Sequence, residues 1–262
     1  MFTTRGGRVR IHDPAPEAGQ AARAYVERNA ADTAARIEDG RPGTATATTD
    51  LAEALAGAWL VIEAVPERLE LKKRIFAELD ATADADAILA SNPSSYPTSR
   101  FIDHVARPER VLNMHFYMPP RQPAVDLMSS GRTDRTVLDL LLAELPRYGV
   151  FPFEAHREST GFVFNRIWAA IKRESLAVVA EGVSTPQDVD AMWRINTGLA
   201  AGPFRAMGSV GLDVVLDIEN HYAAENPALP AGPRELLQRH VDAGRLDVKT
   251  GRGFYDDYAE RD

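Results

Sequence analysis

Residues 59–81 of the chain read WLVIEAVPERLELKKRIFAELDA, and this stretch decides the fold. Residues 59–64 form an apolar run with the length of one buried strand. Residues 69–81 are then dominated by strong helix formers. A buried strand followed directly by a helix is the repeating unit of parallel sheets, so the stretch predicts an α/β fold.

The same alternation continues on both sides of this unit. The pattern predicts strands at residues 8–13, 44–48, 87–92, 111–116, 124–128 and 150–154, and helices at residues 14–38, 49–55 and 133–148. Strands that alternate with helices imply a mostly parallel sheet. We expect this sheet and its helices to form one α/β domain over residues 1–156.

The pattern changes after Ala155. Residues 161–181 predict one long helix, in which an apolar stripe recurs at helical spacing on Phe164, Ile167, Trp168 and Ile171. The sequence STPQD at residues 184–188 has the chemistry of a helix cap, and further helices are expected to about residue 243. We therefore predict an all-helical C-terminal domain over residues 157–262.

The composition narrows the classes of function. A formal net charge of −8 argues against nucleic acid as a partner, because phosphate neutralisation needs a surplus of Lys and Arg. The absence of cysteine excludes disulfides, thiolate zinc sites and a cysteine nucleophile. The six histidines show no close ligand spacing, so no metal is expected. Without an apolar run of about 18 residues or a signal peptide, a cytoplasmic protein with no membrane contact is the expectation.

Acidic residues lie at or just beyond the ends of two predicted strands. Asp13 ends the first strand, where an acid in a dinucleotide-binding unit accepts hydrogen bonds from ribose hydroxyls; the alternative is a helix cap before Pro14. Glu63 and Glu67 accompany the strand at residues 59–64, at the edge where open α/β sheets bind ligands. The alternative for Glu67 is the first turn of a helix, where the helix dipole favours acids.

A second group of polar residues follows the next strands. The sequence SNPSS at residues 91–95 offers hydroxyls and an amide, although capping is the plainer explanation. His115 and Asp126 lie on successive apolar strands, and a His–Asp pair would compensate the buried acid and orient the imidazole as a base. A lone core histidine is the alternative. A hydrolase triad with Ser94 is disfavoured, because no G-x-S-x-G elbow surrounds that serine.

A series of short strings makes the chain recognisable. Together, over about residues 6–255, the strings resemble the 3-hydroxyacyl-CoA dehydrogenase family. In order they are EAVPERLELKK (63–73), SNPSS (91–95), RPERV (107–111), MHF (114–116), GFVFNR (161–166), GPF (202–204), VGLD (210–213) and KTGRGFY (249–255). The resemblance implies an NAD-binding Rossmann domain, then a helical domain that forms a homodimer, and oxidation of the hydroxyl of an L-3-hydroxyacyl-CoA to a ketone.

The resemblance also assigns roles in catalysis. His115 matches the catalytic base, which takes the hydroxyl proton. Asp126 stands where the family has a glutamate that orients the histidine. Ser94 and Asn165 match the polar pair that holds the substrate oxygen and the base. Arg36 is a further candidate, for a phosphate of the substrate.

Cofactor contacts follow from the same resemblance. Asp13, Glu67, Lys72 and Lys249 match positions that contact NAD, and Ser94 is counted with them.

Several departures from the family pattern bear on the substrate. The orienting acid is one methylene shorter than glutamate, Met118 replaces an asparagine, and Pro93 interrupts the usual Asn-Thr-Ser-Ser. Residues 40–43, GRPG, cut off a helical hairpin that helps acyl-CoA enzymes to hold CoA. A related branch, similar to lambda-crystallin and gulonate dehydrogenase, oxidises free hydroxy acids and is the alternative.

The front of the chain departs most. Family members begin with a strand and a G-x-G-x-x-G loop, whereas residues 1–7, MFTTRGG, resemble only the end of the helix after that loop. The absent strand is central, so its neighbours on both sides are expected to lose partners, and weak NAD binding follows. We expect either a longer natural product or a chain with an exposed groove. A non-catalytic family member is a further alternative.

Overall fold

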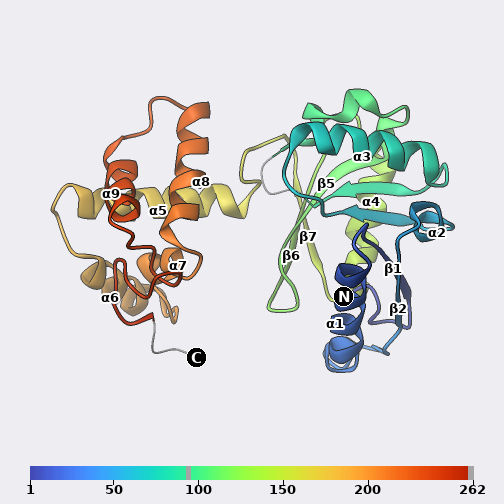
Figure 1. The fold of residues 1–262 in the computed structure, drawn as a ribbon, viewed down its shortest axis with the longest axis horizontal. Coiled ribbons are helices and arrows are strands. Elements are labelled where there is room, and N and C mark those ends of the chain that lie inside the picture. The colour runs from blue at the N-terminus through green and yellow to red at the C-terminus, as the bar shows by residue number, and fades with distance from the viewer. Residues whose placement is uncertain (93–95, 259–262) are drawn as a thin grey trace. The chain divides into compact units, whose positions relative to one another are not determined.

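The computed structural model describes residues 1–92 and 96–258 of the chain. These residues form two compact units, Met1–Val163 and Phe164–Asp262, which Figure 1 shows as an α/β unit and a helical unit. Each unit is described by itself below.

The strands of the α/β unit form two sheets. One sheet has two parallel strands and the other has five, in the order β3-β4-β5-β6-β7, with β5 and β6 as the antiparallel pair. The strands are β1 (Arg8–His12), β2 (Thr44–Thr48), β3 (Leu60–Glu63), β4 (Ile88–Ser91), β5 (Val111–Met118), β6 (Gln122–Met128) and β7 (Phe151–Ala155). The predicted α/β class with a mostly parallel sheet is therefore confirmed.

Four α-helices connect these strands, together with short 3-10 segments. The helices are α1 (Pro16–Ala34), α2 (Leu51–Leu55), α3 (Leu69–Thr82) and α4 (Arg135–Glu144). Two expectations about their ends are wrong. The first helix ends at Ala34, short of residue 38, and α2 begins at Leu51 rather than at residue 49, because Asp50 caps it by accepting hydrogen bonds from the amides of Ala52 and Glu53. Asp50 lies next to the first helical residue, within reach of these orphan amides.

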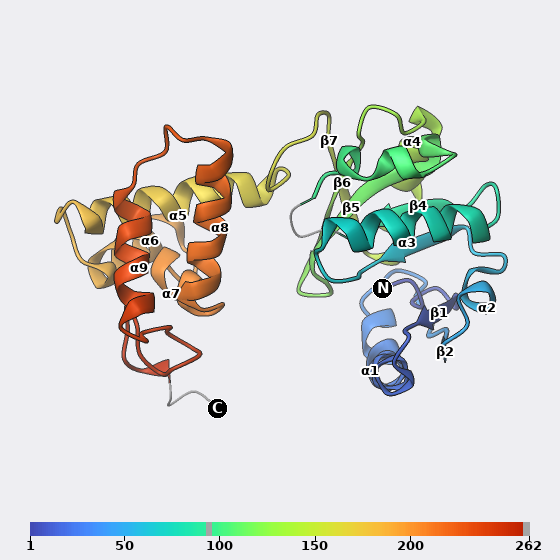
Figure 2. The same ribbon diagram turned by 45° about the horizontal axis from the view of Figure 1, so that its top comes forward.

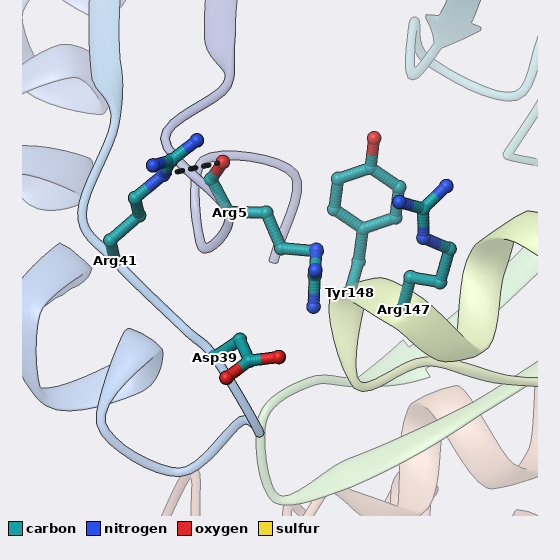
Figure 3. Close-up of a pocket in the computed structure, with 5 residues that line it drawn as sticks. All are labelled: Arg5, Asp39, Arg41, Arg147 and Tyr148. Carbon is teal, nitrogen blue, oxygen red and sulfur yellow. Dashed lines mark hydrogen bonds between the residues drawn. The ribbon is translucent and has the colours of Figure 1, made fainter.

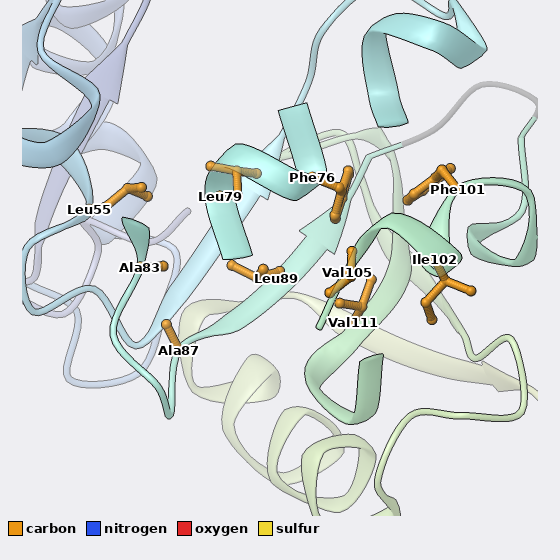
Figure 4. Close-up of a cluster of buried hydrophobic side chains, with 10 residues drawn as sticks. All are labelled: Leu55, Phe76, Leu79, Ala83, Ala87, Leu89, Phe101, Ile102, Val105 and Val111. Carbon is orange, nitrogen blue, oxygen red and sulfur yellow. The ribbon is translucent and has the colours of Figure 1, made fainter. Parts of the chain in front are cut away.

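The five-stranded sheet has a hydrophobic core on each face. Leu89 points to the side of α3, where the rings of Phe76 and Phe101 lie 4.6 Å apart between centroids (Figure 4). Its neighbours Ile88 and Ala90 point to the opposite core, with side chains of α4. Because side chains alternate along a strand, a strand that is apolar at every position is covered on both sides.

The division of the strands between two sheets is the most unusual feature of the α/β unit. β1 and β3 belong to different sheets, although both follow the α/β alternation predicted from sequence. β3 pairs with β4 on one side, and its residues Leu60, Val61 and Ile62 stay partly exposed, whereas β4 is buried throughout. Partly exposed apolar side chains are unusual on an edge strand, because such an edge can pair with another chain.

The helical unit contains five described helices around one core. They are α5 (Phe164–Ala180), α6 (Pro186–Thr197), α7 (Pro203–Gly208), α8 (Leu212–Glu225) and α9 (Gly232–Asp242) (Figure 2). The core joins Leu176 of α5, Phe204 of α7, Leu237 of α9 and Phe254 near the C-terminus. Thr185 caps α6 by accepting a hydrogen bond from the Asp188 amide, which confirms the cap predicted at residues 184–188. None of the helices in the described part of the chain has the length and apolarity needed to cross a membrane.

Candidate active site

His115 and Asp126 face each other across the β5–β6 pair. They are direct partners in the antiparallel register, and both residues are buried, at 8% and 2% exposure. Directly opposed side chains of antiparallel strands lie closest to one another. The His115 Nδ1 atom is 3.7 Å from Asp126 Oδ2, which is an ion-pair contact and too long for a hydrogen bond.

Two aromatic residues complete this group. The Phe162 ring stacks on the His115 imidazole with 4.6 Å between centroids and 4° between planes. The Tyr117 ring meets the imidazole edge-on, and its hydroxyl donates a hydrogen bond to Asp126 Oδ2. Sequence reasoning missed both residues. The spacing of two on one strand could have indicated Tyr117, because it puts Tyr117 on the same face as His115.

A buried polar network lies at the carboxyl ends of β3 and β4. The Lys72 ammonium, with no exposed surface, donates to both Glu63 carboxylate oxygens at 3.1 and 2.9 Å and to Ser91 Oγ at 3.3 Å. It also lies 3.2 Å from Glu67 Oε2, while Glu67 Oε1 accepts from the Tyr96 amide at 2.6 Å. Burying a charge without a partner is costly, and here Lys72 has two carboxylates.

This network bears on two expected cofactor contacts. Glu67 keeps a partly exposed side chain, at 20%, at the edge where ligands of α/β sheets bind. Lys72 lies behind it, with its ammonium occupied within the protein. Ser94 belongs to residues 93–95 and lies outside the described residues.

Asp13 lines a cavity of about 300 Å³ at the carboxyl end of β1. Gly19 and Gln20 of α1 and Thr48 of β2 also line it. Asp13 Oδ1 accepts a hydrogen bond from the Ala15 amide at 2.8 Å, so the acid does hold the chain before the helix. A carboxylate accepts at both oxygens, so this contact is compatible with a second partner in the cavity.

The remaining expected site residues lie elsewhere. Arg36 is exposed in the turns after α1. Asn165 is half-buried in the first turn of α5, in the helical unit. Lys249, in the same unit, donates to both carboxylate oxygens of Asp213 at 2.8 and 2.6 Å.

Comparison with known families gives this geometry its context. Residues 1–157 match the family model described as the 3-hydroxyacyl-CoA dehydrogenase NAD binding domain, and residues 161–257 match that of the 3-hydroxyacyl-CoA dehydrogenase C-terminal domain. The chain belongs to the 3-hydroxyacyl-CoA dehydrogenase family. As a member of this family it is an NAD-dependent oxidoreductase.

Members of the 3-hydroxyacyl-CoA dehydrogenase family that resemble the chain differ in length and substrate. A 3-hydroxyacyl-CoA dehydrogenase-like protein of Cochliobolus heterostrophus is 45% identical over 56% of this chain and 31% of its own length, so the chain matches under a third of that relative. A 3-hydroxybutyryl-CoA dehydrogenase of Mycobacterium tuberculosis is 36% identical over 84% of this chain and 77% of its own.

The enzyme in one similar solved structure acts on a different substrate. It is a 5-formyl-3-hydroxy-2-methylpyridine 4-carboxylic acid 5-dehydrogenase, called an NAD⁺-dependent dismutase. It is 28% identical with a TM-score of 0.76, over 99% of this chain and 86% of that one. The 5-formyl-3-hydroxy-2-methylpyridine 4-carboxylate 5-dehydrogenase of Mesorhizobium japonicum is likewise 28% identical, over 96% of this chain and 84% of its own length.

Proposed function

We propose that the chain oxidises the hydroxyl of an L-3-hydroxyacyl-CoA to the 3-ketoacyl-CoA, with His115 as general base. The observation that carries the proposal is the His115–Asp126 pair, buried and in register across β5 and β6. Asp126 faces Nδ1 of the imidazole, which leaves Nε2 as the nitrogen for a substrate. An acid on one nitrogen orients the ring and raises the basicity of the other.

The reaction requires a proton and a hydride to leave the carbinol group. His115 Nε2 takes the hydroxyl proton, and as the O–H and C–H bonds break the C–O bond becomes a carbonyl. NAD, when bound, would supply the acceptor for the hydride. Asp126 stabilises the imidazolium that results, and Phe162 limits rotation of the ring by stacking on it. In this proposal Ser94 and Asn165 hold the substrate oxygen.

The cofactor fits the polar edge of the α/β unit. In this proposal Asp13 accepts hydrogen bonds from the ribose hydroxyls in its cavity. Glu67 contacts the cofactor, and the buried Lys72 ammonium holds the Glu67 carboxylate in place. Lys249 is the further contact in the proposal, once released from Asp213. The described residues contain no G-x-G-x-x-G loop to offer amides to the pyrophosphate, and β1 and β3 are not joined by a strand. This favours weak binding by the chain as given.

A free hydroxy acid is the second candidate substrate. Only nine residues, 35–43, separate α1 from β2, so in the described chain this segment has no helical hairpin to hold CoA and its cations are Arg36 and Arg41. The structural relative that acts on a pyridine carboxylate covers 99% of this chain. A small anionic substrate would need one cation, such as Arg36, rather than a nucleotide site.

We also propose that the helical unit forms a homodimer. Apolar side chains on α5 and α6 are more than half exposed, at 55% for Phe164, 55% for Ile167, 63% for Met192 and 81% for Ile195. Apolar side chains gathered on exposed helix faces are typical of interfaces.

The test compares two substrates that differ only in the thioester. NADH absorbance is followed with (S)-3-hydroxybutyryl-CoA and with (S)-3-hydroxybutyrate, both at high NAD. Turnover of the thioester alone is expected. Preference for the free acid would move the function to the second candidate. The absence of NADH from either substrate, in a folded protein, would favour the non-catalytic alternative.

A further inference from the structure

A second polar cavity lies at the opposite end of the strands from the proposed cofactor site. It measures about 370 Å³ and is lined by Arg5, Asp39, Arg41, Arg147 and Tyr148 (Figure 3). Arg5 precedes β1, Arg41 precedes β2 and Tyr148 precedes β7. The cavity therefore lies at the amino ends of these strands, whereas Asp13 and Glu63 lie at carboxyl ends.

The backbone fixes two of the arginines side by side. Arg5 and Arg41 form an isolated parallel bridge ahead of β1 and β2. The Gly6 amide donates to the Arg41 carbonyl at 2.8 Å, and the Arg41 amide donates to the Thr4 carbonyl at 2.8 Å. Gly6 adopts a φ of 74°, and a Cβ atom there would lie 2.7 Å from Arg41 Nε. The glycine thus lets the Arg41 side chain cross the turn.

The charges of this pair are uncompensated. Arg147 has its own carboxylate, since Nη1 lies 2.8 Å from Glu144 Oε2. Within residues 1–92 and 96–258, by contrast, Arg5 and Arg41 have no carboxylate within ion-pair distance. Their hydrogen bonds go to backbone carbonyls, from Arg5 Nη1 to Glu38 at 3.1 Å and from Arg41 Nε to Arg5 at 3.4 Å.

This arrangement favours an anion, although Arg41 and Arg147 are exposed to solvent. Like charges on directly opposed residues repel, and a guanidinium has five N–H donors, most of which remain available here. Figure 3 shows Arg5 extending between Asp39 on one side and Tyr148 and Arg147 on the other. Among the described residues, Asp39 is the one acid that lines the cavity, and its negative charge opposes the binding of an anion.

We propose that this cavity binds a phosphate group, as a phosphate ester or pyrophosphate, through Arg5 and Arg41 with Arg147 and the Tyr148 hydroxyl. Guanidinium forks match phosphate oxygens in pairs, which favours phosphate over a monovalent anion. The volume is at the lower end of the range of roughly 300–1,000 Å³ typical of small-molecule sites. Because the cavity lies at the far end of the strands, its ligand does not compete with NAD.

The test is calorimetric titration of sodium pyrophosphate into the full chain, with and without NAD. Saturable binding is expected, unchanged by NAD. Arg41→Gln should weaken it roughly ten- to hundredfold, the loss of charged hydrogen bonds. Asp39→Asn should tighten it, and asparagine suits the φ of 54° at this position. The control is Arg132→Gln, because Arg132 is an exposed arginine paired with Asp103. This substitution removes the same charge and should leave the affinity for pyrophosphate unchanged.

The outcomes separate cleanly. Arg147→Gln, which should also weaken binding, serves as a second variant if Arg41→Gln unfolds, because within residues 1–92 and 96–258 its side chain hydrogen-bonds to Glu144 alone. Absence of saturable binding would overturn the proposal, and so would an equal effect of Arg41→Gln and Arg132→Gln, or displacement of pyrophosphate by NAD. Dehydrogenase activity enters none of these readouts, so failure here and failure of the proposed function are distinguishable.

Discussion

At the scale of single residues, strand register explains how the proposed catalytic pair comes together. His115 and Asp126 lie 11 positions apart in sequence, and the antiparallel pairing of β5 with β6 makes them direct neighbours. Aspartate is one methylene shorter than glutamate, and Asp126 Oδ2 lies 3.7 Å from His115 Nδ1. The Tyr117 hydroxyl donates a hydrogen bond to that same oxygen. Asp126 is thus shared between an imidazole and a phenol.

Loss of the imidazole should remove general base catalysis. For His115→Ala we expect turnover to fall roughly 10²–10⁴-fold, the usual contribution of a positioned base, with little change in the folded state. His156→Ala is the matched control, because His156 belongs to the same unit with 84% of its side chain exposed. Initial rates of NADH formation measure the effect. Near-full turnover by His115→Ala would show that another group takes the proton.

The charge of Asp13 should set the preference between NAD and NADP. The carboxylate repels a 2′-phosphate and accepts ribose hydroxyls. Asp13→Asn keeps an acceptor for the Ala15 amide and removes the charge, so the ratio of kcat/KM for NAD to that for NADP should fall roughly tenfold. Asp13→Ala should reduce the ratio too and also loosen the start of α1. A wild-type chain that prefers NADP would contradict the assignment.

Sequence predicted part of this site for identifiable reasons. Asp13 and Glu67 follow apolar strands, and His115 and Asp126 are polar residues within two further apolar strands, so the hydrophobic pattern made all four stand out. Phe162 was not predictable in this way, because it reaches His115 from a loop where it adopts a φ of 54°. Such a contact depends on tertiary structure rather than on periodicity.

At the scale of elements, periodicity predicted helices better than it predicted their partners. The stripe at Phe164, Ile167, Trp168 and Ile171 correctly indicated α5. Yet the side that α5 buries in its own unit carries Leu176 and other residues, while Phe164 and Ile167 stay exposed at 55% each. An apolar stripe on a helix indicates a face that packs against other side chains, but it does not indicate whether those side chains belong to the same chain.

The turn near the C-terminus should make stability depend on pH. Asp247 is fully buried, and burial raises the pKa of its carboxyl from 3.8 to about 6, although the Tyr255 amide donates to it. Between pH 4 and 6 the folded state therefore binds more protons than the unfolded state. Stability contributed by this group is present below about pH 4 and is lost as the pH rises through about 6.

Asp247→Asn should remove that loss. Its melting temperature relative to wild type should rise by roughly a few degrees between about pH 4 and about pH 7. Asp217, an exposed acid of α8 in the same unit, provides the control. The melting temperature of Asp217→Asn should differ from that of wild type by the same amount at both pH values. Thermal scans at the two pH values provide the measurement. An unchanged gap between Asp247→Asn and wild type would mean that Asp247 ionises normally in the fold.

At the scale of the whole molecule, the exposed helix faces predict a homodimer. Light scattering at micromolar concentration should give twice the mass of one chain. Ile195→Glu, at a position 81% exposed, should yield monomers, because a charge buried at an interface without a partner costs several kcal/mol. Leu140→Glu, on α4 in the other unit and 45% exposed, is the control that should remain dimeric. A single-chain mass for the wild type would refute the prediction.

The division of the sheet predicts how the whole chain meets its cofactor. β1 and β3 each end a separate sheet, so backbone groups along both edges have no ladder partner among the described residues. Each such group left dry costs about 1–3 kcal/mol, and the pyrophosphate of NAD lacks the amides of a glycine loop. The contact proposed between Asp13 and the adenosine ribose does not depend on that loop. This chain should therefore bind NAD with a Kd weaker than roughly 0.1 mM.

Calorimetric titration of NAD measures this affinity, and a fusion tests its cause. A strand followed by a G-x-G-x-x-G segment, joined ahead of Met1, would supply both a partner for the two edges and the amides. It should tighten binding by roughly two orders of magnitude, since two or three charged hydrogen bonds are regained. The same fusion with alanines in place of the glycines restores the strand alone, so it should raise the melting temperature with little gain in affinity. Low-micromolar binding by the unfused chain, with one cooperative thermal transition of the α/β unit, would mean that the open edge is no obstacle to the cofactor.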